Sequence, residues 1–301
     1  MLVPKAKCMR GLILLLLLFT TGNLFPQFNS GWELQNYFSY TGSVNDLIYF
    51  PSNKIIAVGD YGEIYYSENG GIDMLKIPTG FLYHLRALTF RDSLSGFASG
   101  HGGTILKTSD GGKEWESLSS GVTDNLFDIE INGNYIIAVG EKGKILKSTD
   151  EGQTWSLKHF NSSYYLLAVK FFNKDTGNAV GSEGVILRTT NAGETWFQQN
   201  SVPIPDVQLI DIDVSGSNGV ICGDSTVLLY SSNEGNTWER SIVDTNYIRT
   251  LYRIRFYDDL NIIGLGDALV KSTDGGASFD IVYYTVRIRS LSLISADSVY
   301  T

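Results

Sequence analysis

The sequence has little proline, little cysteine and few positive charges. Of its 301 residues, 6 are proline, 2 are cysteine and 23 are lysine or arginine, against 32 aspartate and glutamate residues, which gives a formal charge of −9. This excludes a disulfide scaffold, and an acidic chain lacks the basic surface that nucleic-acid binding requires. With 43% hydrophobic and 18% charged residues, disorder is excluded as well. The 32 glycines and 12% aromatic residues instead predict aromatic-rich strands joined by tight turns.

The N-terminus has the parts of a secretory signal peptide. Basic residues within positions 1–10 precede an apolar run over 11–19 and small residues at 20–22. The run is shorter than the roughly 20 residues that span a bilayer, although an uncleaved membrane anchor stays open as the alternative. We predict a signal peptide over residues 1–22, ending by about residue 28. The protein is then secreted, or held in the bacterial periplasm or cell envelope.

A short motif, which we call the box, recurs six times along the chain. It is typified by residues 148–155, Ser-Thr-Asp-Glu-Gly-Gln-Thr-Trp, and its central Asp or Asn recurs every 40–42 residues. Upstream of each box stand alternating apolar runs and a triplet like Ala-Val-Gly, whose glycine lies at positions 59, 100, 140, 181, 223 and 264. Alternation with a period of two and glycine punctuation indicate strands. Each unit therefore predicts four short strands, A to D, with the box between C and D.

Four-stranded units at this spacing predict the blades of a β-propeller. The complete units are residues 46–80, 86–119, 126–159, 167–200, 209–242 and 251–284. Residues 287–294 match a further strand A, and residues 31–35 match the end of a box with strand D. We predict an all-β, seven-bladed propeller of four-stranded antiparallel blades, a single domain over 30–301, whose last blade is shared by both termini. Because that blade lacks strand C and a box, we expect the natural chain to continue past Thr301.

The residue types of the box suit a tight turn. Asp or Asn accepts backbone N–H groups, glycine adopts conformations closed to other residues, and tryptophan buries apolar area. We expect a structural role for Asn69, Asp110, Trp115, Asp150, Trp155, Asn191, Trp196, Asn233, Trp238 and Asp274. The central residue is Asn in three of the six boxes, whereas a calcium loop needs several carboxylates. We therefore expect no metal and no cofactor.

The box resembles the Asp-box, also called the bacterial neuraminidase repeat. The whole unit, from Ala138-Val-Gly to Trp155, is similar to that of the photosystem II stability/assembly factor-like β-propeller family, and the resemblance covers nearly all of residues 30–301. It implies a propeller with assembly-factor activity, meaning a chaperone-like grip on a partner from a membrane complex.

In such a propeller the B–C and D–A connections share one face, which we call the loop face. Varied loops on a rigid scaffold are a usual way to build a binding site. The candidate binding residues there are Asp60, Tyr61, Tyr83, His84, His101, Glu141, Tyr164, Glu183, Asp224 and Arg249. The alternative is that these residues only form solvated turns.

Strand A lies nearest the central channel and carries charges at alternate positions. The candidate channel residues are Asp128, Glu130, Asp211, Asp213, Arg253, Arg255 and Arg289. Since buried charges usually pair, we expect a polar, water-filled channel with ion pairs. A patch in which Arg253, Arg255, Arg287 and Arg289 contact an anion or a peptide is the alternative.

Glycoside hydrolysis is the rival function, because sialidases also carry Asp-boxes. A sialidase needs an Arg-Ile-Pro element in an early blade, but residues 30–80 contain no arginine and Arg-Ile-Pro occurs nowhere. No nucleophile elbow, phosphate loop or metal-binding histidine spacing is present either. We predict a non-catalytic, monomeric module that binds a protein partner or an extracellular ligand, and no nucleic acid. A hydrolase of sialidase or glucanase type remains the alternative.

Overall fold

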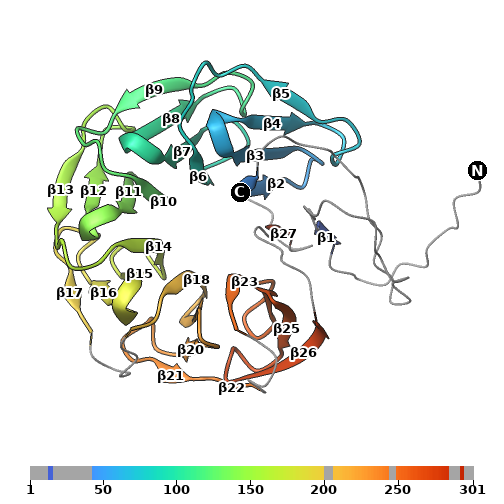
Figure 1. The fold of residues 1–301 in the computed structure, drawn as a ribbon, viewed down its shortest axis with the longest axis vertical. Coiled ribbons are helices and arrows are strands. Elements are labelled where there is room, and N and C mark those ends of the chain that lie inside the picture. The colour runs from blue at the N-terminus through green and yellow to red at the C-terminus, as the bar shows by residue number, and fades with distance from the viewer. Residues whose placement is uncertain (1–12, 16–42, 200–205, 244–248, 285–291, 295–301) are drawn as a thin grey trace, which may run out of the picture.

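The structure is a computed structural model, and it describes residues 13–15, 43–199, 206–243, 249–284 and 292–294. Within them the chain forms a ring of six β-sheets around a central channel (Figure 1). In each sheet four successive strands form an antiparallel meander that runs outward from the channel, and together the sheets form the blades of a propeller. The predicted all-β propeller is therefore confirmed.

Blades 1 to 6 comprise β2–β5, β6–β9, β10–β13, β14–β17, β18–β21 and β23–β26. The innermost strands are β2 (Val44–Tyr49), β6 (Leu85–Phe90), β10 (Leu126–Asn132), β14 (Leu166–Phe171), β18 (Leu209–Ser215) and β23 (Leu251–Phe256). The second strands are β3 (Ile55–Gly59), β7 (Gly96–Gly100), β11 (Tyr135–Gly140), β15 (Gly177–Gly181), β19 (Asn218–Gly223) and β24 (Ile262–Gly266). The third strands are β4 (Ile64–Ser67), β8 (Thr104–Thr108), β12 (Ile145–Ser148), β16 (Ile186–Thr189), β20 (Leu228–Ser231) and β25 (Ala268–Ser272). The outer strands are β5 (Leu75–Ile77), β9 (Glu116–Ser119), β13 (Ser156–His159), β17 (Phe197–Gln198), β21 (Glu239–Arg240) and β26 (Ser278–Tyr284).

Two short strands lie in the ring between blades 6 and 1. β1 (Ile13–Leu15) pairs antiparallel with β27 (Ser292–Ile294), and β27 lies beside the innermost strands β2 and β23 (Figure 1). β27 thus takes the place of the innermost strand of a seventh blade, in line with the predicted blade number. β1 falls inside the predicted signal peptide, so its pairing would exist only in an uncleaved chain. The strand predicted at residues 31–35 lies outside the described residues.

Blade 6 carries one strand that the repeat did not predict. β22 (Ile242–Val243) pairs in parallel with β26, so the segment that leaves blade 5 runs along the outer edge of blade 6. An added strand covers backbone groups that an edge strand would otherwise expose.

The core consists of apolar layers between neighbouring blades. Ile56 and Leu106 pack between blades 1 and 2, and Phe97 and Ile136 pack between blades 2 and 3. The second strands are buried along their whole length in several blades, as in β15, because both faces of each blade meet a neighbour. This packing fixes the innermost strands around the channel.

Each box folds into the same hydrogen-bonded turn. The Ser148 hydroxyl donates to Asp150 Oδ1 at 2.8 Å and accepts the Gly152 N–H at 2.9 Å. Asp150 Oδ1 also accepts the Thr154 N–H at 2.9 Å, and Trp155 Nε1 donates to the Gly152 carbonyl at 3.0 Å. The other five boxes repeat the bonds of the hydroxyl and of the central Asp or Asn. These oxygens are thus occupied by the turn itself.

Close approach of a backbone carbonyl oxygen explains why a glycine ends each second strand. A Cβ on Gly140 would lie 2.1 Å from the Asn125 carbonyl oxygen, which precedes the innermost strand of the same blade. In blade 6 this contact belongs to Gly266, whose Cβ would lie 2.1 Å from the Thr250 carbonyl oxygen. The sequence assignment of Gly264 to this position is wrong, because only Asp267 connects β24 to β25. The B–C connection of blade 6 is therefore shorter than the spacing of the boxes indicates.

Candidate binding site

The innermost strand of each of blades 1 to 6 contains a β-bulge at its second residue. Its pairing with the second strand passes from the first residue to the third, as from Leu126 to Asp128 in β10. A bulge leaves one extra residue unpaired and redirects its side chain. The bulged residues, one in each blade, are Asn45, Arg86, Phe127, Leu167, Ile210 and Tyr252.

All six bulged residues line one pocket at the end of the central channel. This pocket, which we call the mouth, has a volume of about 570 Å³ and is completed by Glu141, Tyr165, Gln208 and Arg253. Glu141 belongs to the 3-10 turn η3 (Glu141–Gly143) between β11 and β12, and Tyr165 and Gln208 directly precede innermost strands. The mouth therefore opens on the loop face. Its volume lies in the usual range for ligand pockets, about 300–1,000 Å³.

A row of aromatic and imidazole rings runs along the loop face from blade 1 to blade 4. The ring centroids are 5.1 Å apart for Tyr61 and His84, 5.0 Å for His84 and His101, 6.4 Å for His101 and Phe127, and 6.1 Å for Phe127 and Tyr165. Phe127 and Tyr165 lie in the mouth, whereas Tyr61 at the other end is 61% exposed. The row thus joins the mouth to an exposed part of the loop face.

Two further exposed side chains extend this surface. Leu82 and Tyr83 are 82% and 61% exposed. The Tyr83 ring lies against the 3-10 turn η2 (His101–Gly103), since a Cβ on Gly102 would be 3.4 Å from it. Exposed aromatic and aliphatic side chains that gather on one surface often mark an interaction site.

The Asp60 carboxylate holds the start of the ring row in place. It accepts hydrogen bonds from Asn45 Nδ2 at 3.0 Å and from the Ser43 N–H at 3.3 Å, and its contact with His84 Nδ1 is 2.8 Å. Burial raises the pKa of Asp60, but the bonds from Asn45 and His84 outweigh burial and hold this pKa below its ordinary value. Burial, with Arg86 and His84 nearby, lowers the pKa of His101. These surroundings therefore favour the neutral form of the His101 imidazole.

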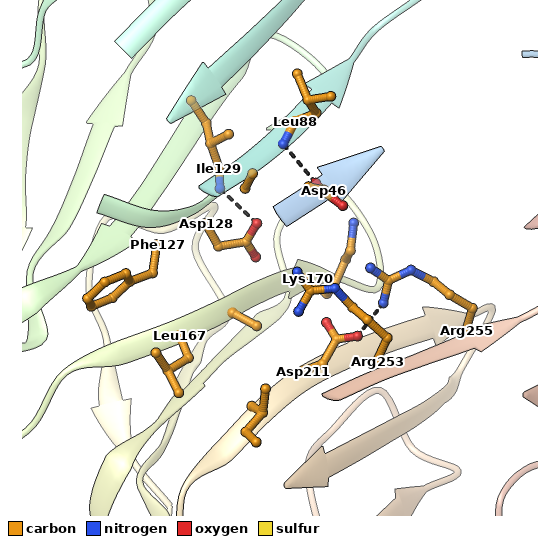
Figure 2. Close-up of a pocket in the computed structure, with 13 residues that line it drawn as sticks. Asp46, Leu88, Phe127, Asp128, Ile129, Leu167, Lys170, Asp211, Arg253 and Arg255 are labelled. Carbon is orange, nitrogen blue, oxygen red and sulfur yellow. Dashed lines mark hydrogen bonds and ion pairs between the residues drawn. The ribbon is translucent and has the colours of Figure 1, made fainter. Parts of the chain in front are cut away.

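Beside the mouth, the channel contains a smaller cavity of about 70 Å³ (Figure 2). Three carboxylates in its wall each accept a backbone N–H from the innermost strand of the next blade. Asp46 accepts from Leu88 at 2.8 Å, Asp128 from Val169 at 2.8 Å, and Asp211 from Ile254 at 2.9 Å. These channel carboxylates therefore connect neighbouring blades.

Ion pairs neutralise much of the remaining channel charge. Lys170 Nζ lies 2.7 Å from Glu130, and Arg255 Nη1 lies 2.5 Å from Asp211 (the second pair is drawn in Figure 2). Burial raises the pKa of Asp128 to about 7, although Lys170 opposes this shift. Burial likewise raises the pKa of Asp213, whose carboxylate accepts the Phe256 N–H at 2.8 Å. Among the described channel residues, these charges are therefore paired with one another or hydrogen-bonded to the backbone.

Arg253 differs from the other channel cations in its partners. Its guanidinium donates to the Tyr252 carbonyl at 3.1 Å and, across the seventh-blade position, to the Asn45 carbonyl at 3.0 Å. Within the described ranges no carboxylate lies within ion-pairing distance of Arg253, and its buried Nε has no acceptor there. Arg253 lines both the mouth and the smaller cavity.

The structure separates the predicted loop residues into groups. Glu141 lines the mouth, and Asn125 Nδ2 donates to it at 2.6 Å. Asp60, Tyr61, Tyr83, His84 and His101 form or adjoin the ring row. Glu183 in η4 (Ser182–Gly184), Asp224 and Arg249 lie elsewhere on the loop face, where Asp224 accepts the Gln208 N–H at 3.0 Å. Arg287 and Arg289 lie outside the described residues.

Tyr164 is a correction to the predicted site. It is only 8% exposed, packs in the layer between blades 3 and 4, and its hydroxyl lies 2.8 Å from His159 Nε2. A Cβ on Gly143 would lie 2.7 Å from its ring, so the side chain fills the space over this glycine. The accessible tyrosine is the next residue, Tyr165.

Sequence reasoning missed the bulged residues because a bulge breaks the period of two. Regular alternation of channel-facing and core-facing side chains begins only at the third residue of each strand. A prediction from alternation therefore finds Asp128 and Asp211 but not Phe127 and Ile210. The missed signal is positional, since each bulged residue directly follows the buried Val or Leu that opens an innermost strand.

The described residues contain neither a metal-binding cluster nor a helix that could span a membrane. Among them, no three His, Cys, Asp or Glu side chains gather closely enough to hold a metal ion. Nor does the described part of the chain contain a helix long and apolar enough to cross a membrane.

Blades of four strands joined by the box define a β-propeller with bacterial neuraminidase-type repeats. The family model described as "Photosynthesis system II assembly factor YCF48" matches residues 73–164 and 157–255, more than half of the chain, and the chain therefore belongs to this family. The sequence matches no curated protein.

Solved structures show the same fold. YCF48 from Cyanidioschyzon merolae has a TM-score of 0.64 at 15% identity, over 81% of this chain and 87% of that one. A YCF48 bound to a D1 peptide has a TM-score of 0.62 at 18% identity, over 81% of this chain and 78% of that one. A GH74 enzyme from Niastella koreensis has a TM-score of 0.65 at 14% identity over 81% of this chain, but the match spans only 45% of the enzyme. At these identities the likeness extends to the fold alone.

Proposed function

We propose that this protein is a non-catalytic binding module, secreted or held in the cell envelope, which grips a protein partner through the loop face around the mouth. The observation that carries the proposal is the pocket of about 570 Å³ with arginine, aromatic and aliphatic side chains in its wall. Aromatic residues and arginine supply most of the binding energy in many protein interfaces. The YCF48 structure with a bound D1 peptide supports a peptide or protein as the class of ligand.

The surroundings of the mouth support the same proposal. Short turns carry the exposed Tyr61, and the buried blades beneath fix the position of each turn. A surface ordered before binding loses little conformational entropy when a partner docks. The predicted signal peptide supports a place outside the cytoplasm, where assembly of envelope complexes would occur.

Paired surface variants test which face binds. The full chain is immobilised as wild type, as a loop-face variant, and as a control changed on the box side of the ring. The loop-face variant carries Tyr61→Ser, Leu82→Ser and Tyr83→Ser, and the control carries Ile72→Ser, Leu94→Ser and Leu260→Ser. All six residues are exposed, so neither variant should lose much stability.

We expect wild type and control to retain the same envelope protein from native extracts, quantified by mass spectrometry. The loop-face variant should retain at least about tenfold less, since interface centres contribute about 2 kcal/mol or more. Equal retention by the loop-face variant, or loss with the control alone, would refute the proposed binding face.

Glycoside hydrolysis remains the second candidate, because the pKa of Asp128 rises to about 7, as a general acid requires. The GH74 xyloglucanase from Xanthomonas campestris also shares the fold, with a TM-score of 0.64 at 11% identity over 80% of this chain and 45% of that one. The cavity beside Asp128 is about 70 Å³, however, far below the roughly 300 Å³ of the smallest usual ligand pockets. Hydrolysis of xyloglucan or sialyllactose by wild type, abolished in Asp128→Asn, would overturn the non-catalytic proposal.

A further inference from the structure

The wall of the mouth has an apolar part and a polar part. The bulged residues of blades 3 to 6 are Phe127, Leu167, Ile210 and Tyr252, whereas blades 1 and 2 supply Asn45 and Arg86. Because the same bulge presents each residue from consecutive blades, the four apolar side chains form one continuous arc. In the described part of the chain, none of them belongs to the apolar layers between blades.

Because these four side chains lie outside the core, core packing does not explain why they are apolar. Side chains in the layers between blades contribute to stability through burial, but these four are only partly buried and face a pocket. Partly exposed apolar side chains that converge on a concave surface gain free energy when a ligand covers them. The arc therefore fits an apolar group of a ligand.

Arg253 stands where the apolar arc ends. It follows Tyr252 on β23 and reaches the backbone of blade 1 at the Asn45 carbonyl. A guanidinium has five N–H donors, and Arg253 uses some of them on two carbonyl oxygens. It shares the smaller cavity with Asp46, Asp128 and Asp211, but no carboxylate of the described ranges lies within ion-pairing distance of it. A carboxylate in the mouth would complete its pairing through charge-assisted hydrogen bonds.

The apolar arc and Arg253 together indicate which class of ligand fits the mouth. A volume of about 570 Å³ admits a side chain with its flanking backbone but not a folded surface. A neutral sugar could stack on the aromatic rings but would leave Arg253 without a direct ion pair. A small inorganic anion would leave the apolar arc uncovered.

We infer that the mouth receives a peptide segment of the partner, which inserts one large apolar side chain against Phe127, Leu167, Ile210 and Tyr252 and directs a nearby carboxylate to Arg253. This rests on the proposed function and names the chemistry of the partner. The apolar side chain supplies the affinity, and the carboxylate fixes the orientation of the segment.

Four small probes separate these contributions. N-acetyl-L-phenylalanine carries a ring and a carboxylate, its amide lacks the carboxylate, N-acetylglycine lacks the ring, and cellobiose represents a neutral sugar. Binding of each to the full chain is measured by NMR titration. We expect N-acetyl-L-phenylalanine to bind at least about fivefold more tightly than each of the other three, about 1 kcal/mol.

Variants locate the bound probe. Ile210→Glu should weaken both phenylalanine probes at least tenfold, and Arg253→Gln should remove the preference for the acid over the amide. Arg253→Lys keeps the positive charge and should therefore keep part of that preference. This variant distinguishes a loss of charge from a loss of the hydrogen bond to blade 1. The exposed outer residues supply matched controls, Ile242→Glu and Arg240→Gln, which should bind as wild type does.

Two outcomes overturn the inference. Either no probe binds or cellobiose binds best, or Ile210→Glu and Arg253→Gln bind N-acetyl-L-phenylalanine as tightly as their controls do. If either occurs while the loop-face variant still loses its envelope partner, only this inference fails. If the probes bind as expected but no partner depends on the loop face, the proposed function fails instead.

Discussion

At the residue scale, Asp128 shows how a partly buried carboxylate can connect two blades at an electrostatic cost. It accepts the Val169 N–H from the next blade, yet burial raises its pKa to about 7 from 3.8. The folded state therefore binds this proton more tightly than the unfolded state does. Its contribution to stability is fully present below about pH 4 and is lost as the pH rises through about 7.

Asp128→Asn should remove this pH dependence, because an amide oxygen can still accept the Val169 N–H but carries no charge. We expect the variant to exceed wild type in free energy of unfolding by about 1–4 kcal/mol at pH 8, with the difference shrinking toward pH 4. Urea unfolding at pH 5, 6, 7 and 8 measures it, with the exposed Asp206→Asn as control. A difference that stays constant across this range would contradict the assigned cause.

The box hydroxyl is a second residue with a specific role. Ser148→Ala removes the acceptor of the buried Gly152 N–H and the donor to Asp150. An unsatisfied buried donor costs about 1–3 kcal/mol, so we expect a loss of that size in thermal or urea unfolding. The exposed Ser162→Ala should change stability by less than about 0.5 kcal/mol. Equal stability of the two variants would show that the hydroxyl is dispensable.

At the scale of the strand, the glycine ending each second strand is set by a carbonyl oxygen of the same blade. Gly140→Ala would place a Cβ 2.1 Å from the Asn125 oxygen, so the backbone must shift, and we expect a loss of about 2–4 kcal/mol in urea unfolding. Gly121 has a φ of +75° but nothing within 4 Å of its Cβ position. Gly121→Ala should therefore cost only about 1 kcal/mol. Similar losses in both variants would mean that backbone conformation, not close approach, requires the glycine.

The repeat made most elements of the blades predictable, because each unit contains its four strands and its turn residues in the same order. The predicted unit 126–159 corresponds to blade 3, from Leu126 to His159. The exceptions lie where a connection departs from the repeat. The shortened turn at Asp267 led the sequence assignment to Gly264 instead of Gly266. The strand β22 belongs to the fifth predicted unit but pairs with blade 6.

The site was less predictable than the fold, since it depends on local backbone geometry that residue alternation does not encode. The channel charges Asp128 and Asp211 were found because they follow the alternation of the innermost strands. Phe127 and Ile210 were missed because only the paired structure reveals the bulge. Tyr164 was misplaced because neighbouring tyrosines face opposite sides, one into the core and one into the mouth.

At the scale of the whole molecule, the ring brings one bulged side chain from each of six blades to a single mouth. No short segment of the chain could do this, since the bulged residues are about one unit apart in sequence. The bond from Arg253 to the Asn45 carbonyl further links the last described blade to the first across the ring. The mouth thus forms only when the blades close into a ring. It opens on the loop face, where the row of aromatic and imidazole rings also lies.

The central claim is that the partner docks on the loop face, and photo-crosslinking at single sites tests it most directly. A photoreactive phenylalanine analogue replaces, one at a time, the exposed Tyr61 and Tyr83 on the loop face and Ile72 and Leu94 on the box side, in the full chain within its native envelope. We predict that one partner crosslinks from Tyr61 and Tyr83 but not from Ile72 or Leu94. Crosslinks to that partner from Ile72 and Leu94, with none from Tyr61 and Tyr83, would contradict the account.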